Sequence, residues 1–171
     1  MVNVDYSGQC HFRLSTVIRI NRRTDYAIRV LLALAKRPPG TRLSSAQIRG
    51  EMLIPPALAQ RIIAELARGG FLTTFPGRDG GVQLARSAAQ INLRQVVEHF
   101  EGPILISDCM TARLDCPFEN RCPVRRRWDR LQALICRELE SLTFDQLALE
   151  ALEAEGLTAA PVAALSVEPD T

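Results

Sequence analysis

The spacing of apolar residues predicts a helix between Thr24 and Lys36. Hydrophobic side chains recur there every three or four positions, as in a helix with one buried face: Ala27, Ile28, Leu31, Leu34 and Ala35. Thr24 is expected to cap this helix, and Asp25 lies in its first turn, where the helix dipole favours an anion. The run Pro38-Pro39-Gly40 then ends it.

Two shorter helices are predicted next, separated by a tight turn. The first begins at Ser44, which can form a capping box with Gln47, and runs to about Glu51. The second begins at Pro55-Pro56, because proline is tolerated in a first helical turn, and ends at Arg68 before two glycines. Its buried stripe is expected to be Ala59, Ile62, Ile63 and Leu66. Two such helices resemble a helix-turn-helix.

A β-hairpin is predicted directly after the helix-turn-helix. The runs Phe71–Phe75 and Val82–Leu84 favour strands, and the turn Pro76–Gly81 between them is rich in glycine. A hairpin in this place predicts a winged helix-turn-helix, so the expected fold class is mainly α with a small β wing. Arg78 lies at the wing tip, where it could enter a narrow minor groove; the alternative is a solvated loop arginine.

Three further helices are predicted in the C-terminal part of the chain. A capped helix starts at Asn92 and ends near Phe100, and Thr143 caps a last short helix. Between them a long helix runs from Pro123 through Glu140. Its apolar residues form one seam: Val124, Trp128, Leu131, Ile135, Leu139 and Leu142. This seam is too long to share one small core, so the helix is expected to pair with a second copy in a homodimer.

These elements divide the chain into five predicted segments. Residues 1–17 form an N-terminal extension, residues 18–102 the winged helix-turn-helix domain, and residues 103–124 a cysteine loop. Residues 125–155 hold the dimerisation helix and the C-terminal helix. Residues 156–171, rich in alanine and proline, are expected to be disordered.

Charge is distributed unevenly over the 171 residues. Up to Arg137, the last basic residue, 21 basic and 11 acidic side chains give a net charge of +10, and the eight acidic side chains that follow give −8. A basic body with an acidic tail favours a polyanion such as double-stranded DNA over a membrane surface. No apolar run approaches the roughly 20 residues of a membrane span, and the first residues lack a secretion signal, so a cytoplasmic protein is expected.

The predicted helix-turn-helix and wing supply the residues expected to contact DNA. They are Ser44, Ser45, Pro56, Ala57, Gln60, Arg61, Arg68 and Arg78. Gln60 has the capacity for a bidentate contact with adenine, whereas Ala57 and Leu58 offer only apolar contact. One recognition helix is expected to read each half of a pseudo-palindromic operator.

Three of the five cysteines lie close together in a segment without helical or strand period. Cys109, Cys116 and Cys122 fall within fourteen residues, and a proline directly follows each of the last two. In a cytosolic chain such cysteines indicate metal or redox ligands rather than a disulfide framework. Three thiolates on a loop that cannot become regular therefore predict a site for a soft metal.

Two other interpretations of these cysteines stay open. Zinc could be bound by the three cysteines with His99 or Cys136, although the paired C-x₂-C spacing typical of zinc sites is missing. Without metal, the cysteines could form disulfides under oxidation and act as a thiol redox sensor. An enzyme is not expected, because the sequence has two histidines, no phosphate-binding loop and no Ser-His-Asp set.

Several runs of the chain together resemble the Rrf-type winged-helix repressors. They cover about residues 18–152 in the family's order: RTDYAIRVLLALAK, IPPALAQRIIAELARGGFLTTFPGRDGGVQLAR, INLRQVVEHFEG, the three cysteines and ESLTFDQLA. That family includes the iron–sulfur cluster regulator and the nitric-oxide-sensing repressor NsrR. The resemblance implies a homodimeric DNA-binding repressor whose operator affinity depends on an iron–sulfur cluster that senses nitric oxide, iron or redox state.

The resemblance also implies the ligands of this cluster. The iron–sulfur cluster regulator uses a histidine shortly after its third cysteine, but the run CPVRRRW at Cys122 contains none. The nitric-oxide-sensing branch uses an aspartate at the start of the first helix of the other subunit, and Asp25 in RTDYAIRV matches it. The implied ligands are therefore Cys109, Cys116, Cys122 and Asp25, which favours a 4Fe–4S over a 2Fe–2S cluster. Otherwise Asp25 is an ordinary acid at a helix N-terminus.

Overall fold

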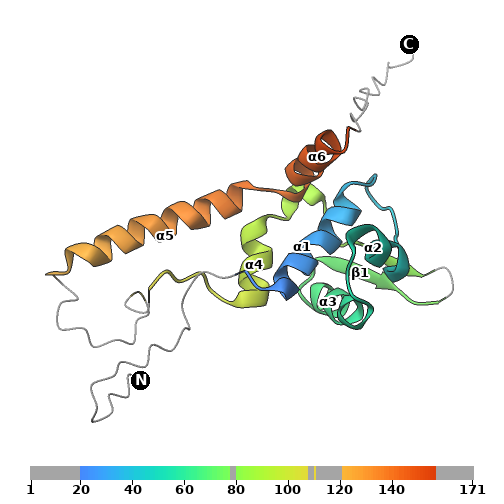
Figure 1. Cartoon of the computed structure of the whole chain (residues 1–171), viewed down its shortest axis with the longest axis horizontal. Coiled ribbons are helices and arrows are strands. Elements are labelled where there is room, and N and C mark those ends of the chain that lie inside the picture. Colours follow the sequence, from blue (N-terminus) through green and yellow to red (C-terminus); the bar gives the residue numbers. More distant parts are fainter. Residues whose placement is uncertain (1–19, 78–79, 108–109, 111–120, 157–171) are drawn as a thin grey trace, which may run out of the picture.

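The computed structural model describes residues 20–77, 80–107, 110 and 121–156 (Figure 1). The elements in these ranges are α1 (Arg22–Ala35), α2 (Ser45–Met52), α3 (Pro56–Arg68), β1 (Leu72–Phe75), β2 (Gly81–Leu84), a 3-10 helix η1 (Ala88–Gln90), α4 (Leu93–Glu101), α5 (Pro123–Ser141) and α6 (Phe144–Ala154). The strands form one antiparallel sheet. The fold is mainly α with a small β wing, which confirms the predicted class. The predicted N-terminal extension, the wing-tip residues 78–79 and residues 157–171 of the predicted tail lie outside the described residues.

Helix α1 is the central element of the core and contacts α2, α3, α4 and α6. Its buried face carries small and branched residues that let neighbouring helices approach closely: Ala27, Val30, Leu31, Ala33 and Leu34. Most of the predicted stripe is thus buried, and Ile28 and Ala35 pack at its edge.

The start of α1 differs from the prediction. Asn21, not Thr24, is the N-cap, and its side-chain oxygen accepts hydrogen bonds from the N–H groups of Arg23 and Thr24. Thr24 lies inside the helix, fully buried, and its hydroxyl donates to the carboxylate of Glu101 in α4. The predicted cap was wrong because a distant partner, invisible in the local pattern, engages the threonine hydroxyl.

The helix-turn-helix follows the predicted pattern closely. Ser44 and Gln47 form the complete capping box of α2, and α3 starts at Pro56. The four residues expected to be buried in α3 are buried. The turn between the helices contains Leu53, whose φ of 52° puts a non-glycine residue in the left-handed region.

The wing is fixed to the helix-turn-helix through the residue that precedes α2. In the hairpin, Leu72 pairs with Leu84 and Phe75 with Gly81. Leu43 exchanges two backbone hydrogen bonds with Val82, at 3.0 and 2.9 Å, and so adds a short bridge to the outer edge of β2. The base of the wing is therefore hydrogen-bonded to the segment that leads into α2.

Helix α6 packs on α1 rather than along α5, with which the sequence pattern grouped it. Phe144 is fully buried and Ala148 nearly so. The backbone N–H of Phe144 donates to the carbonyl of Ile91 at 2.9 Å, and Thr143 bridges Asn92. The last helix is therefore part of the winged-helix core (Figure 1).

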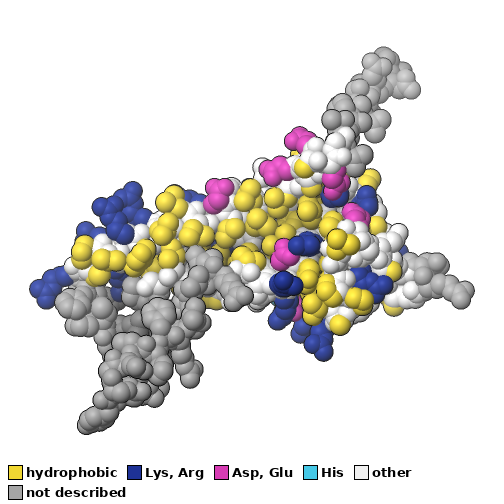
Figure 2. All heavy atoms as spheres, in the orientation of Figure 1, with side chains coloured by type: hydrophobic (Ala, Val, Ile, Leu, Met, Phe, Trp, Pro, Cys, Tyr) yellow, Lys and Arg dark blue, Asp and Glu magenta, His cyan; other side chains and the backbone are white. Residues whose placement is uncertain are grey.

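Helix α5 extends away from this core (Figure 1). None of its 19 residues is buried. Its exposed large apolar side chains are Val124, Trp128, Leu131 and Leu134, which are 36–55% exposed. Figure 2 shows a continuous hydrophobic strip along this helix. Such an uncovered apolar strip marks an interaction surface.

Candidate nucleic-acid interface and cysteine site

The outer face of α3 presents the residues predicted to contact DNA. Pro56, Ala57, Gln60, Arg61 and Arg68 are all exposed, because the opposite stripe of the helix is buried in the core. Two arginines on an exposed recognition helix can neutralise backbone phosphates.

The two predicted serines have structural partners in the turn. The Ser44 hydroxyl accepts the N–H of Gln47 as part of the α2 cap, at 3.2 Å. The Ser45 hydroxyl accepts the side-chain amide of Gln60 at 3.0 Å. Gln60 is therefore tied to α2, which restricts how its amide can approach a base.

A hollow of about 410 Å³ opens beside this outer face. It is lined by Leu58, Arg61, Ala64 and Arg68 of α3 together with Arg23 of α1. The lining, which also includes Ile62 and Glu65, thus combines apolar side chains with guanidinium groups and one carboxylate.

Arg23 is a residue of this face that the sequence pattern missed. Its guanidinium pairs with Glu65 of α3 and lies 5.4 Å from the centroid of the Phe100 ring. The hydrogen bond from Arg23 lowers the pKa of Glu65, although partial burial opposes the shift. The sequence did contain an indication of this pair. A cation in the first turn of a helix interacts unfavourably with the helix dipole, so an acidic partner is expected nearby.

Arg42 is a second missed residue, at the base of the wing. Its guanidinium stacks over the Phe75 ring at 3.6 Å from the centroid. This cation–π contact joins the segment before α2 to β1. Arg78, the predicted wing-tip residue, lies outside the described residues, so its groove contact stays a prediction.

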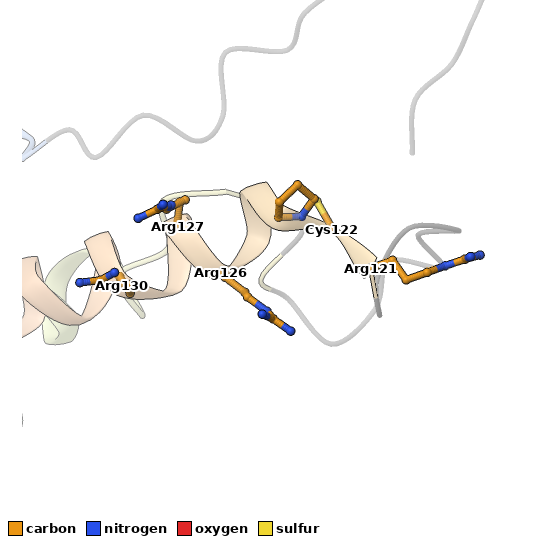
Figure 3. A pocket seen from close by; sticks show the side chains of 6 residues that line it. Arg121, Cys122, Arg126, Arg127 and Arg130 are labelled. Carbon is orange, nitrogen blue, oxygen red and sulfur yellow. The ribbon is translucent and has the colours of Figure 1, made fainter.

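Of the three loop cysteines, Cys122 lies within the described residues, whereas Cys109 and Cys116 do not. Cys122 is the half-buried N-cap of α5, directly before Pro123. A hollow of about 470 Å³ at this end is lined by Cys122, Pro123 and four arginines: Arg121, Arg126, Arg127 and Arg130. Figure 3 shows the arginine side chains spread around the helix start. The helix dipole and these cations favour negative charge here.

Asp25, the fourth predicted ligand, lies in the first turn of α1. Its carboxylate is 46% exposed and pairs with Arg29 at 2.9 Å. Figure 1 shows the start of α5 far from the first turn of α1, so one chain does not bring Asp25 and Cys122 together. Within the described ranges, no group of three or more His, Cys, Asp or Glu side chains forms a metal site.

Cys136, one of the two alternative zinc ligands, lies far from Cys122 along α5. Cys136 is fourteen residues further along α5, which corresponds to about 21 Å at the rise of an α-helix. One ion cannot bind both thiolates of the same chain. His99 contacts Phe71 and Phe100 edge-on, with ring centroids 5.5 and 5.2 Å apart.

Comparisons with known proteins decide the family. A family model described as "Rrf2: Iron-dependent Transcriptional regulator" matches residues 20–150. The chain belongs to the Rrf2 family. It is therefore similar over most of its length to transcriptional regulators, and within the described ranges no helix is long and apolar enough to cross a membrane.

Two curated relatives of this Rrf2 chain extend the comparison. "Protein aau3" of Rhizobium meliloti (strain 1021) is 30% identical over 132 residues, which is 76% of this chain and 84% of the relative. The "HTH-type transcriptional regulator NsrR" of Shouchella clausii (strain KSM-K16) is 27% identical over 133 residues, which is 77% of this chain and 89% of the relative.

Solved structures support the winged-helix fold of the Rrf2 chain. CymR, the global cysteine regulator of B. subtilis, has a TM-score of 0.65 at 21% identity, covering 78% of this chain and 98% of that one. IscR of T. potens has a TM-score of 0.64 at 20% identity, covering 81% and 91%. These likenesses confirm the fold.

Proposed function

We propose that this Rrf2 regulator is a homodimeric repressor whose affinity for DNA is set by an iron–sulfur cluster. The proposed ligands are Cys109, Cys116 and Cys122 of one copy and Asp25 of the other. The observation that carries the proposal is the position of Asp25: it shares the first turn of α1 with Arg23, which holds the recognition helix through Glu65. A change at Asp25 can therefore reach α3 through one helical turn.

The residues present fit such a cluster. Three thiolates and a carboxylate form a donor set for iron, and Cys122 lies at the N-terminus of α5, beside a hollow that four arginines line. When bound, the cluster supplies an iron site that small molecules attack, and the carboxylate-held iron is the most exchangeable. The description of the matching family model as an iron-dependent transcriptional regulator supports an iron centre on this chain.

The second copy supplies the other half of the site. The apolar strip on α5 is uncovered in one chain and offers a surface for the same helix of a second copy. Pairing along α5 would carry the Cys122 end of one copy toward the α1 of the other. Loss of the Asp25 ligand would then relax the two recognition helices, and repression would be lifted by nitric oxide, loss of iron or oxidation.

A zinc-bound or clusterless thiol sensor is the second candidate. Cys122 supports it, because this half-buried free cysteine borders a hollow lined by four arginines, and a free thiol can bind zinc or be oxidised. The winged-helix fold is common to both candidates, so metal content separates them.

The test is purification of the full chain without oxygen, followed by iron, sulfide and zinc analysis and a visible absorption spectrum. We expect about four irons and four sulfides per chain, as a 4Fe–4S cluster requires. Nitric oxide should bleach the absorption and release operator DNA. Asp25→Ala should make the cluster more labile, while Glu153→Ala on α6 serves as a matched acidic control. A colourless zinc protein, or a cluster indifferent to Asp25→Ala, contradicts the proposed ligand set.

A further inference from the structure

Leu58 is an exposed hydrophobic residue in the first turn of the recognition helix. Its side chain is 36% exposed, and it lines the hollow with Arg61, Ala64 and Arg68. Leu58 lies at the edge of the buried stripe of α3, one turn before the buried Ile62, which lines the same hollow.

The first turn of α3 has very few groups that could donate a hydrogen bond to DNA. Pro55 and Pro56 have no backbone N–H. The N–H groups of Leu58 and Ala59 both donate to the carbonyl of Pro55, at 3.0 and 3.2 Å. The side chains of this turn are hydrocarbon, and all of them lie within the described residues. The N-terminal end of the recognition helix, which contacts base edges in a major groove, therefore has an apolar surface.

Gln60, the nearest polar side chain, does not compensate for this lack. Its amide donates to Ser45 at 3.0 Å and is thereby held against α2. Arg61 and Arg68 remain exposed at the rim of the hollow, where they suit phosphates that flank the groove.

The C5 methyl group of thymine is the apolar group that base edges present in the major groove. An exposed leucine without polar neighbours in its turn matches that group and none of the donors or acceptors around it. We infer that Leu58 is a specificity residue that reads thymine methyl groups in the operator. This inference rests on the proposed function, namely that the chain binds DNA through α3.

The experiment starts with the anaerobically purified full chain and selection of bound duplexes from a random pool. In the selected sequence, each thymine is then replaced singly by deoxyuridine, which pairs identically and lacks only the methyl group. We expect one or two positions per half-site at which binding weakens about fourfold, since burying one CH₂-sized group contributes about 0.8 kcal/mol.

Leu58 variants assign the effect to the side chain. Leu58→Ala should bind the thymine duplex about as weakly as the wild type binds the deoxyuridine duplex, and should no longer distinguish the two. Leu58→Met should keep the distinction, and Leu149→Ala, an exposed leucine on α6, should behave as wild type.

The outcomes separate the inference from the proposed function. Specific binding without any loss on deoxyuridine substitution overturns the inference and leaves DNA recognition intact. Unchanged discrimination in Leu58→Ala also overturns it. Failure of the chain to select any duplex in any cluster state overturns the proposed function and the inference together.

Discussion

Arg23 in α1 pairs with Glu65 in α3, forty-two residues further along the chain. The same first turn of α1 is fixed on its other side, because Glu101 accepts hydrogen bonds from the Asn21 N–H at 3.0 Å, from the Asn21 side-chain amide at 2.8 Å and from the Thr24 hydroxyl. Glu101 is the last residue of α4, from which the chain continues toward the cysteines. The turn that carries Asp25 thus connects the recognition helix with the segment leading to the cysteine loop.

Arg23→Ala is expected to weaken DNA binding more than it weakens the fold. The pair is partly exposed, so its loss should reduce the free energy of unfolding by no more than about 1 kcal/mol. The unpaired Glu65 carboxylate would then face the phosphates of DNA and reduce affinity. Adding Glu65→Gln should restore part of this affinity, which a binding titration of both variants would show. Equal affinities of wild type and Arg23→Ala would contradict the role of the pair.

The Arg23–Glu65 pair also predicts a dependence of stability on pH. The hydrogen bond from Arg23 lowers the pKa of Glu65 from its ordinary value of 4.5. A carboxylate with a lowered folded-state pKa stabilises the fold above the unfolded value, and the contribution disappears as the pH falls through the folded value. Melting curves of wild type and Glu65→Gln should therefore differ most near neutral pH and converge below 4.5. If the stability difference between wild type and Glu65→Gln grew as the pH fell, the pKa of Glu65 would be raised in the folded state, contrary to this prediction.

Lys36 is expected to anchor the end of α6 to the helix-turn-helix. Its ammonium lies 2.8 Å from Glu155 and 3.4 Å from Glu51, and its side chain is only 7% exposed. Lys36→Met should lower the free energy of unfolding by about 1.5–3 kcal/mol, the range for hydrogen bonds to charged groups. Hydrogen exchange should show earlier opening of α6. Arg37→Ala, which removes a more exposed partner of Glu51, is the control and should have a smaller effect.

Gly81→Ala is expected to loosen the wing. A Cβ atom at Gly81 would lie 2.8 Å from the carbonyl oxygen of Leu43. That oxygen is held in place because it accepts the Val82 N–H, while the Leu43 N–H donates to the Val82 carbonyl. The overlap should cost about 1–3 kcal/mol, as other overpacked sites do. Gly50→Ala is the matched control: nothing lies within 4 Å of its Cβ position, and alanine in a helix should raise stability by up to about 1 kcal/mol. Thermal melts of both variants measure the difference.

Leu131→Glu is expected to prevent pairing along α5 without unfolding the domain. Leu131 lies in the uncovered strip, and no residue of α5 is buried in the single chain. Light scattering should give the monomer mass for this variant and the dimer mass for the wild type, with unchanged helical content. Leu149→Glu on α6 is the control at another exposed leucine, outside the strip on α5. A dimer that persists in Leu131→Glu would place the interface elsewhere.

Local patterns in the sequence predicted most of the fold. The capping boxes at Ser44 and Asn92 and the buried stripe of α3 depend on residues within one or two helical turns, so spacing alone reveals them. The α1 cap was wrong for the opposite reason. Thr24 bonds to Glu101, seventy-seven residues away, and no local pattern contains that contact.

The residue types of the candidate site could be predicted from the sequence, but the side-chain contacts among them could not. The exposed face of α3 follows from its period, whereas the partners of Arg23 and Gln60 depend on how α1, α2 and α3 cross. Asp25 and the cysteines came from the family resemblance, and their joint role as ligands remains a prediction that needs the second copy.

The packing of α6 on α1 has a consequence for synthesis of the chain. Lys36 pairs with Glu155, which lies 119 positions further along the chain, and Phe144 is buried in the core beside α1. A nascent chain that has emerged only as far as α5 still lacks α6, whose Phe144 completes the hydrophobic core. Contacts between residues so far apart in the sequence form late. The ribosome therefore completes the cysteine segment and α5 before it completes the winged-helix core.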